Sequence, residues 1–447
     1  MSNPGEADAT PITSLAQLAD DLAAGCKRPA DFRIGTEHEK FGFAPIDLAP
    51  PLYFPKGIKA VLEGLQSEHF TPILDQGALI GLKGEGPEAG ASISLEPGGQ
   101  LELSGAPLAD LHQTKHEFIR HFDALRPVAE SLGLGFAPVG FHPLARREEM
   151  PWMPKSRYAI MRRYMPKRGK LGLDMMLRTC TVQVNLDFSS EADMVRKFRV
   201  SLMLQPLATA LFANSPFEEG YPSGYLSTRA HIWTDVDPDR SGIPPVVFDD
   251  GFGFERYVDW ALDVTMYFVQ RHGKLIDLAG RSFRDHLKGK LDTELKGALG
   301  PATLGDFTDH LTTLFPDVRL KRFLEMRGAD AGSPAMMLAQ SALWVGLLYD
   351  PATLEAVSAH LAAHRWQDYA ALRPQVPRRG LDTKFGRGTL RDLARDVVAL
   401  SYQGLVARGL GEETYLEPLF EIAAGGPTQA EMWLERSARE MLVGAKI

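Results

Sequence analysis

Residues 33–43, "RIGTEHEKFGF", are predicted to form a buried strand that contains two glutamates and a histidine. The alternation places Glu37 and Glu39 on one face of this strand and Lys40 on the opposite face. Two carboxylates on one strand face lie about 6–7 Å apart and repel each other unless a positive group lies between them. The segment therefore predicts a cationic partner for its two glutamates.

Three further strands are predicted to carry polar oxygen donors on one face. They are 94–104 with Glu102, 179–188 with Gln183 and Asn185, and 318–328 with Glu325 on the same face as Arg327. In the first of them, Glu96 comes just before a Pro-Gly-Gly turn. Carboxylate and amide oxygens suit hard cations such as Mg²⁺ or Mn²⁺. The alternative is that each glutamate caps a strand on a solvated face. The repetition of the pattern on three strands favours a metal site.

Helical periodicity accounts for much of the remaining chain. It predicts helices over 108–132 and 191–214, and nearly continuous helix beyond residue 334. The predicted strands do not alternate regularly with helices, which favours an antiparallel sheet. We therefore predict an α+β fold with helices on the outer side of the sheet and a polar cavity on its inner side. Residues 1–12 are predicted to be disordered, and residues 13–447 to form one domain.

The composition is typical of a soluble globular protein, with 44% hydrophobic and 24% charged residues. A formal charge of −8 disfavours generic nucleic-acid binding. The two cysteines, Cys26 and Cys180, exclude a disulfide framework and a four-cysteine zinc site. The first residues lack the basic and apolar regions of a signal peptide, and the apolar stretch 335–349 is too short to span a bilayer. We expect a cytoplasmic protein.

A cationic segment, "MPKSRYAIMRRYMPKRGK" (153–170), contains no acidic residue and predicts an anion-attracting surface. Its Arg157 is favoured for anion binding because a guanidinium binds carboxylate or phosphate through two hydrogen bonds. The cations from Lys167 to Lys170 are interpreted as a solvated helix face. A second candidate segment, "STRAHIWTDVDPDRSG", contains Arg229, Trp233 and Arg240. The chain has no P-loop or dinucleotide-binding glycine motif, so metals and arginines would have to bind phosphates.

Several of these segments resemble glutamate–cysteine ligase of the plant and proteobacterial type. They are "RIGTEHEKFGF", "ISLEPGGQLELSGAPL", "PWMPKSRYAIMRRYMPK", "TCTVQVNLDFSSE", "LSTRAHIWTDVDPDRSG", "DVTMYFVQR" and "FLEMRGAD", in this order. The resemblance implies the catalytic architecture of glutamine synthetase, an antiparallel sheet curled into a funnel that holds Mg²⁺, ATP and amino acids. It also implies ligation of the glutamate γ-carboxylate to the cysteine amine, the first step of glutathione synthesis.

The resemblance further implies roles for individual residues. The ligands of Mg²⁺ would be Glu37, Glu39, Glu96, Glu102, Gln183 and Glu325. The substrate-binding residues would be Arg157, Arg229, Trp233 and Tyr267. Arg327, together with Glu325, would act in phosphoryl transfer. Arg240 and Lys40 would contact the nucleotide.

Two alternatives to this function remain at this point. One is a ligase of the same fold that uses a different amine, and the other is a non-catalytic module that binds metal and nucleotide. The expected partners are glutamate, cysteine and ATP, without nucleic acid or membrane, in a monomer or weak homodimer. Plant enzymes of the resembled type carry regulatory disulfides, which two cysteines cannot reproduce.

Overall fold

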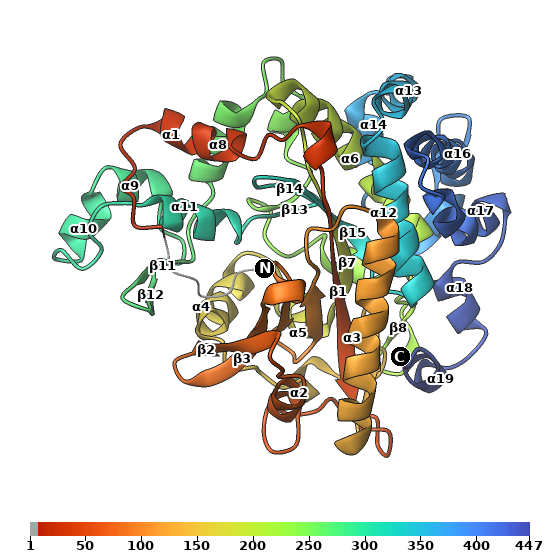
Figure 1. Cartoon of the computed structure of the whole chain (residues 1–447), viewed down its shortest axis with the longest axis horizontal. Helices are drawn as coiled ribbons and strands as arrows, with labels where there is room; N and C mark the ends of the chain where they lie inside the picture. Colours follow the sequence, from red (N-terminus) through yellow and green to blue (C-terminus); the bar gives the residue numbers. More distant parts are fainter. Residues whose placement is uncertain (1–7) are drawn as a thin grey trace.

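An antiparallel sheet of nine strands forms the centre of the protein (Figure 1). The structure, a computed structural model, describes residues 8–447. The strand order is β14-β15-β7-β1-β5-β4-β3-β2, and β6 pairs with the end of β1. The strands are β1 (Ile34–Phe43), β2 (Phe70–Asp75), β3 (Ala78–Gly84), β4 (Ser92–Leu95), β5 (Leu101–Ser104), β6 (Gly135–Ala137), β7 (Thr181–Leu186), β14 (Val318–Leu320) and β15 (Leu324–Asp330).

One face of the sheet is apolar and is covered by three long helices. These are α3 (Leu111–Ser131), α6 (Glu191–Leu211) and α12 (Pro334–Leu348). Alternate residues of β7, namely Val182, Val184 and Leu186, belong to this core and are at most 1% exposed. On β1, Thr36 faces the same side, where its Oγ lies 2.8 Å from the Oγ of Ser341 on α12. The period of two along each strand thus decides which residues meet the helices.

The opposite face of the central strands is polar. Glu37 and Glu39 of β1 and Gln183 of β7 lie on this face and line a cavity. The predicted alternation in both segments is therefore confirmed. The α+β class, with an antiparallel sheet and helices outside it, is confirmed as well, and the sheet is open.

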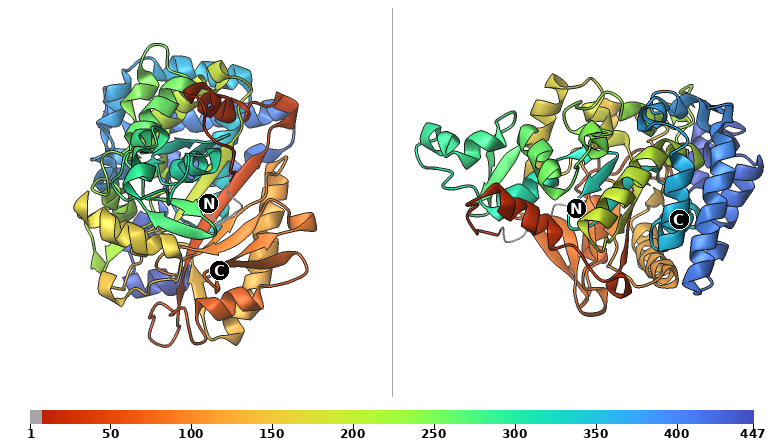
Figure 2. Two further views of the ribbon diagram at one scale, coloured as in Figure 1. Left: turned by 90° about the vertical axis from the view of Figure 1, so that its left-hand side faces the viewer. Right: turned by 90° about the horizontal axis from the view of Figure 1, so that it is seen from above.

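The remaining helices complete the outer layer, and several of the C-terminal ones pack against α12 (Figures 1 and 2). They are α1 (Leu15–Ala23), α2 (Ile58–Gly64), α4 (Ser156–Tyr164), α5 (Gly172–Arg178), α7 (Thr228–Ile232), α8 (Phe254–Asp263), α9 (Phe283–Leu287), α10 (Lys290–Glu294), α11 (Leu304–Leu311), α13 (Pro351–Leu361), α14 (Trp366–Ala370), α15 (Val376–Arg379), α16 (Leu390–Arg408), α17 (Glu417–Ala424), α18 (Gln429–Leu434) and α19 (Ala438–Gly444). Four two-stranded sheets join β8 (Phe217–Glu218) to β9 (Tyr221–Pro222), β10 (Ser241–Gly242) to β13 (Phe315–Pro316), β11 (Phe268–Arg271) to β12 (Lys274–Asp277), and β16 (Lys384–Phe385) to β17 (Gly388–Thr389).

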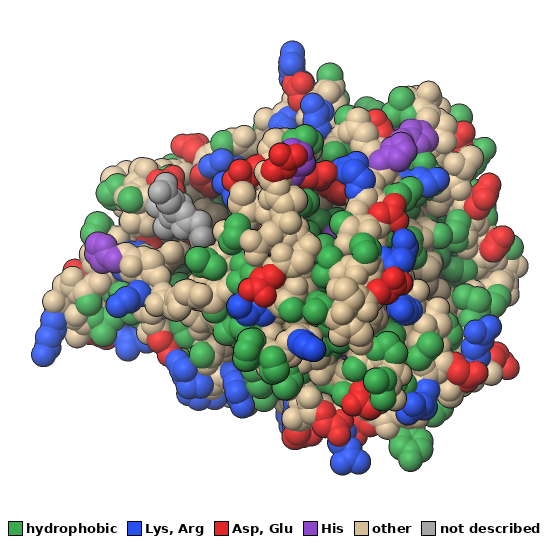
Figure 3. All heavy atoms as spheres, turned by 60° about the horizontal axis from the view of Figure 1, so that its bottom comes forward, with side chains coloured by type: hydrophobic (Ala, Val, Ile, Leu, Met, Phe, Trp, Pro, Cys, Tyr) green, Lys and Arg blue, Asp and Glu red, His purple; other side chains and the backbone are tan. Residues whose placement is uncertain are grey.

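The C-terminal helices lie together on one side of the molecule (Figure 2). The apolar stretch 335–349 forms the buried helix α12, as expected. Among the residues described, no helix is both long enough and apolar enough to cross a membrane. Acidic, basic and apolar side chains are interspersed over the face shown in Figure 3.

Three sequence-based expectations require correction. Residues 318–328 form a hairpin of β14 and β15 rather than one strand, because the chain turns at residues 321–323 without glycine or proline to mark the turn. Residues 94–104 are likewise split between β4 and β5 by the turn at the Pro-Gly-Gly sequence. The predicted disorder falls partly on residues 1–7, outside the described residues. Residues 8–12 are ordered, since their main chain hydrogen-bonds to Ala302, Leu304 and Gly305.

A buried ion pair near the N-terminus of α11 should contribute strongly to stability. Asp306 accepts hydrogen bonds of 2.6 and 2.7 Å from Arg271 and lies 3.1 Å from His286. Burial opposes ionisation of this carboxyl, but the bonds from Arg271 and His286 outweigh it and lower the pKa of Asp306 to about 2. The folded-state pKa is therefore below the unfolded value, so the stabilisation is present at neutral pH and is lost as pH falls through about 2.

We expect Asp306→Asn to lower the free energy of unfolding at pH 7 by about 2–3 kcal/mol, because Arg271 loses its charged partner in a largely buried site. Urea denaturation followed by circular dichroism would measure this loss. Asp263→Asn is the matched control, because Asp263 pairs with Arg284 on the surface, where its side chain is 68% exposed. Equal losses in the two variants would contradict the assignment.

Candidate active site

The strand register brings the oxygen donors of three strands together on the polar face. Glu39 lies directly opposite Glu102 of β5, and Glu37 lies opposite Gln183 of β7. Side chains at such paired positions are direct neighbours on one face of a sheet. They line a cavity of about 120 Å³. The sequence-predicted residues that line this cavity are Glu37, Glu39, Glu96, Glu102, Arg157, Gln183, Arg229, Trp233 and Arg327.

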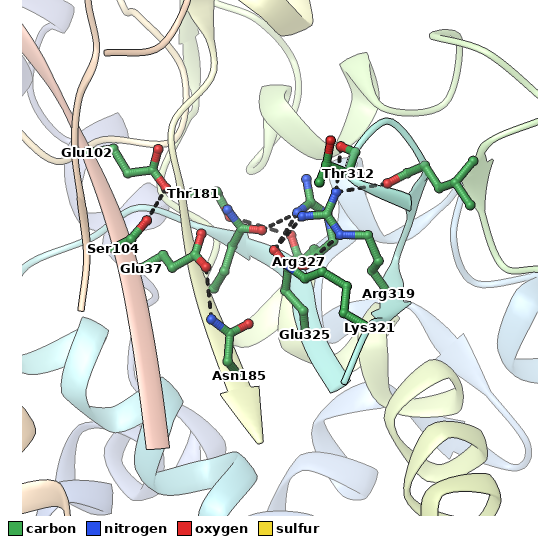
Figure 4. A network of polar contacts seen from close by, with 12 residues as sticks. Glu37, Glu102, Ser104, Thr181, Asn185, Thr312, Arg319, Lys321, Glu325 and Arg327 are labelled. Atoms are coloured by element: carbon green, nitrogen blue, oxygen red, sulfur yellow. Dashed lines mark hydrogen bonds and ion pairs between the residues drawn. The ribbon is translucent and has the colours of Figure 1, made fainter. Parts of the chain in front are cut away.

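Short hydrogen bonds orient these carboxylates (Figure 4). Asn185 donates from Nδ2 to Glu37 Oε1 at 2.8 Å, so this predicted neutral donor supports a glutamate instead of lining the cavity itself. The main-chain N–H of Thr181 donates to Glu39 at 2.9 Å. The hydroxyl of Ser104 donates to Glu102 at 3.1 Å. These bonds leave the cluster with several acceptor oxygens facing one cavity.

The glutamates repel one another in a buried environment. Burial, followed by the charge of Glu96, raises the pKa of Glu39 to about 8. Burial and the charges of Glu96, Glu37 and Glu39 raise the pKa of Glu102 well above its usual range. A bound cation would relieve this repulsion directly.

The donor set fits a divalent cation that prefers oxygen ligands. Four carboxylates and the amide of Gln183 face the smaller cavity. Within the part of the chain that the structure describes, no histidine or cysteine lines it. Within residues 8–447, no three acidic, histidine or cysteine side chains already converge as they would around an ion. Unscreened carboxylates are expected to separate in this way, because each is repelled by the others.

Glu325 lies beside this cavity at the centre of a cationic cluster (Figure 4). Arg319 donates to both of its oxygens, at 2.6 and 2.8 Å, and Arg327 donates to Oε1 at 2.9 Å. The Nζ of Lys321 lies 3.4 Å from Oε2. Although burial opposes ionisation, the three cations hold the pKa of Glu325 well below its usual range.

This arrangement corrects the sequence-based assignment of Glu325 as a metal ligand. Glu325 is 0% exposed and does not line the cavity, and both of its oxygens are already occupied by cations. In the structure, Glu325 binds Arg319 and Arg327, which both line the cavity. Arg327 also donates to the amide oxygen of Gln183, which connects the cationic cluster to the carboxylate face.

Arg229 and Trp233 come to the cavity from α7 and its C-terminal end. The hydroxyl of Ser227 caps α7, and the buried carboxylate of Asp330 accepts a hydrogen bond of 2.8 Å from that hydroxyl. Arg229 donates to the main-chain carbonyl of Arg327 at 2.8 Å. The α7 arginine is therefore fixed relative to β15.

Arg157 enters from α4 on the other side of the cavity. Its guanidinium lies 5.1 Å from the ring centroid of Phe268, and its Nη2 lies 3.4 Å from the hydroxyl of Thr312. The predicted anion-binding arginines Arg157 and Arg229 therefore both reach the cavity.

Two predicted site residues lie behind the cavity and do not line it. Arg240 is 1% exposed, donates to Asp237 at 2.7 Å, and stacks 4.3 Å from the ring of Tyr267. Tyr267 is also 1% exposed, and burial raises its pKa to about 12. The main-chain carbonyl of Arg240 accepts from Phe315, a lining residue, so this pair supports the wall. Their predicted contacts with nucleotide and substrate are corrected accordingly.

Lys40 is the fourth residue whose predicted role must be corrected. Its alternation on β1 places it on the helix side of the sheet, where it is 0% exposed. Its Nζ lies 3.0 Å from His38 and 2.9 Å from His121, and burial lowers its pKa to about 7. The sheet separates Lys40 from the cavity, so its predicted nucleotide contact is not possible in this arrangement.

A second, larger cavity of about 780 Å³ meets the first one at Glu37 and Thr312, which line both. Its charged lining residues are of both signs and include Lys27, Arg33, Lys321 and Arg322 with Asp8, Asp21, Glu37 and Asp187. Lys27 forms an ion pair with Asp187, and Arg322 forms one with Asp21. A ligand in the larger cavity could contact Lys321 and reach the carboxylate cluster at Glu37.

Sequence reasoning missed several lining residues. Arg319 and Thr312 line the first cavity, and so do Lys155 and Tyr158, both of which hydrogen-bond to the main-chain carbonyl of Leu95. Arg319 sits directly opposite Glu325 in the β14–β15 hairpin. Recognising that hairpin would have identified Arg319, but no turn residue announces it.

Comparisons with known proteins agree on one family. The sequence profile of glutamate–cysteine ligase family 2 matches residues 33–445. The chain is 54% identical to chloroplastic glutamate–cysteine ligase B of Oryza sativa subsp. japonica, over 92% of this chain and 82% of the relative. It is also 54% identical to the chloroplastic glutamate–cysteine ligase of Arabidopsis thaliana, over 93% of this chain and 78% of the relative.

A crystal structure of a glutamate–cysteine ligase from Francisella tularensis in complex with AMP has a similar fold. The TM-score is 0.52 at 13% sequence identity, and the match covers 94% of this chain and 88% of that chain. At this identity the likeness concerns the fold alone.

These relatives correct one expectation and confirm another. The rice and Arabidopsis enzymes are named as chloroplastic, which contradicts the expectation of a cytoplasmic protein, and that prediction is wrong. The resemblance seen in the sequence motifs is confirmed. The chain belongs to glutamate–cysteine ligase family 2.

Proposed function

We propose that this chain is an ATP-dependent glutamate–cysteine ligase that joins the γ-carboxylate of glutamate to the amine of cysteine, the first step of glutathione synthesis. The observation that carries the proposal is a cavity lined by carboxylates and arginines, which meets a larger cavity at Glu37, in a chain 54% identical to named glutamate–cysteine ligases. The relatives do not favour a different amine acceptor. A non-catalytic module would not need Arg327 beside the glutamates.

The two cavities suggest separate places for the substrates. The larger one is within the size range of about 300–1,000 Å³ typical of small-molecule sites, and we assign the nucleotide to it. The AMP complex of the Francisella tularensis enzyme supports nucleotide use by this family fold. We assign the amino acids to the smaller cavity, where Arg157 and Arg229 can pair with carboxylates. The phosphoryl group would then cross near Glu37.

We propose that Glu37, Glu39, Glu96, Glu102 and Gln183 hold Mg²⁺, with Mn²⁺ as the alternative ion. Bound there, the ion would neutralise phosphate oxygens and lower the barrier to transfer. The protein's own contribution is to hold the carboxylates, through Asn185, Thr181 and Ser104, at the junction of the two cavities.

The reaction proceeds in two steps. A γ-carboxylate oxygen of glutamate attacks the terminal phosphorus of ATP, forming γ-glutamyl phosphate and releasing ADP. The cysteine amine then attacks the acyl carbon, the bond to phosphate breaks, and the nitrogen loses a proton as inorganic phosphate leaves. Arg327, fixed by Glu325, lies where it can stabilise charge on the group in transit.

Product analysis tests this proposal. The purified protein, incubated with Mg-ATP, glutamate and cysteine, should form γ-glutamylcysteine and ADP, identified by mass. Hydroxylamine in place of cysteine should intercept the acyl phosphate as glutamyl hydroxamate in an ATP-dependent reaction. Absence of both products would refute the proposed function. The monomer or weak homodimer, and the single domain over 13–447, remain predictions.

We expect activity to be independent of an internal disulfide. Cys180 is 0% exposed and Cys26 is half-buried, both are free thiols, and burial raises the pKa of each. Cys26→Ser and Cys180→Ser should therefore keep activity, while Cys180→Ser loses stability, by about 1–3 kcal/mol, from burying a hydroxyl.

The assay should use 2-aminobutyrate as acceptor, because cysteine is itself a reductant. Reversible inactivation by added reductant, abolished in either serine variant, would contradict this prediction.

A further inference from the structure

Arg373 links the helical C-terminal part of the chain to two segments of the site. It follows α14, and its guanidinium makes a bidentate ion pair with Asp317, with Nε–Oδ2 and Nη2–Oδ1 distances of 2.8 and 3.2 Å. The Nη2 group also donates to the main-chain carbonyl of Trp233 at 3.0 Å. One side chain therefore holds two partners that are far apart in sequence.

Both partners belong to segments that supply residues to the smaller cavity. Trp233 ends α7, the helix that carries Arg229. Asp317 joins β13 to β14, and its main-chain carbonyl accepts a hydrogen bond of 3.1 Å from the N–H of Arg327. The bridge made by Arg373 thus joins the Arg229–Trp233 side of the site to the Arg327 side.

A small void makes this bridge important. A separate cavity of about 40 Å³ lies between the two segments, with Arg229, Trp233 and Arg327 on its wall beside Asp317 and Arg373. Side-chain packing does not fill this space, so polar links across it help to fix how far apart the segments lie. These links are the bond from Arg229 to the main-chain carbonyl of Arg327 and the bridge made by Arg373. The guanidinium of Arg373 helps to fix this distance, because its three hydrogen bonds come from one rigid, planar group.

We propose that Arg373 is a positioning residue that sets the separation of α7 from the β13–β14 segment. It thereby sets the shape of the smaller cavity, to which we assign the amino acids. Arg373 does not line that cavity itself. The inference rests on the proposed function, which assigns Arg229, Trp233 and Arg327 to the amino-acid and phosphoryl contacts. The nucleotide cavity shares none of the residues that Arg373 contacts.

The test compares Arg373→Gln and Arg373→Lys with Arg408→Gln in steady-state kinetics and thermal unfolding. Arg408 is a matched control, because it is a similarly buried arginine that pairs with Glu412 at 2.9 Å, away from the cavities. Arg373→Gln should raise the KM for the amino acids about tenfold and lower kcat several-fold, with the KM for ATP within twofold. The kinetic constants of Arg373→Lys should lie between those of the unmodified protein and those of Arg373→Gln, because lysine keeps the ion pair with Asp317 but not all three hydrogen bonds.

Asp317→Asn provides a second variant if Arg373→Gln does not fold, and it should raise the same KM values. In the double variant Arg373→Lys/Asp317→Asn the effects should be less than additive, since both act on one contact. Unchanged amino-acid KM values in the Arg373 and Asp317 variants, or the same kinetic change in Arg408→Gln, would overturn the inference. Failure of the proposed function is distinguishable, because the unmodified protein would then form no product.

Discussion

Replacing Glu39 with glutamine is expected to lower kcat at least about 100-fold at saturating Mg²⁺, and Glu37→Gln should do the same. Each change removes a negative oxygen donor from the face where we place the metal, at the junction of the two cavities. The fold should persist, because glutamine retains the shape of the side chain and can still accept the hydrogen bond from Thr181 or Asn185. Steady-state assays over a range of Mg²⁺ concentrations would measure the loss.

Thermal unfolding of metal-free protein provides an independent readout of the same site. Because the folded-state pKa of Glu39, about 8, lies above the value of an unfolded glutamate, the protonated carboxyl stabilises the fold at low pH, and this stabilisation is lost as pH rises through about 8. Glu39→Gln should therefore raise the Tm more at pH 9 than at pH 5. Added Mg²⁺ should stabilise the unmodified protein more than the variant. Near-normal turnover in both glutamine variants would exclude these glutamates as metal ligands.

The second large effect is expected for Arg327→Ala, with kcat lowered about 100- to 1,000-fold and the KM for ATP changed less than threefold. The proposed contact of Arg327 strengthens as charge develops on the transferring phosphoryl group, so its loss should affect the transition state more than nucleotide binding. Glu325 keeps Arg319 and Lys321 as partners in this variant, so no uncompensated buried charge is created. Rates of ADP release and of hydroxamate formation would both report the loss.

Arg163→Ala is the control for this experiment. Arg163 forms an ion pair of 2.6 Å with Asp277 on the surface, with its side chain 60% exposed, and it does not line either cavity. It should retain normal kcat. If Arg327→Ala instead weakened ATP binding while leaving kcat unchanged, Arg327 would be a ground-state ligand of the nucleotide.

Much of the site could be predicted because strands have a period of two. Alternation within residues 33–43 and 179–188 correctly placed Glu37, Glu39 and Gln183 on one polar face, with Val182 and Val184 of the second strand against the helices. The same alternation also located Lys40 on the helix side, although the resemblance had suggested a nucleotide contact for it. Local periodicity was in this case the better guide.

The cationic cluster around Glu325 could not be predicted in the same way. Its formation depends on a hairpin turn at residues 321–323 that contains no characteristic turn residue, and the turn places Arg319 opposite Glu325. Arg240 and Tyr267 illustrate a related difficulty. Both belong to motifs of the family, yet their side chains pair with each other behind the cavity wall.

The sequence by itself determined the family, the strand faces and most of the carboxylate cluster, because motifs and alternation are local properties of the chain. Only the tertiary structure decided which cations neutralise which carboxylates, where the two cavities meet, and that Arg373 bridges α7 and the β13–β14 segment. The junction of the cavities and the Arg373 bridge join residues that are tens to hundreds of positions apart, and the cluster around Glu325 depends on a hairpin turn. Strand register and helix packing set such contacts, and no short-range pattern in the sequence encodes them.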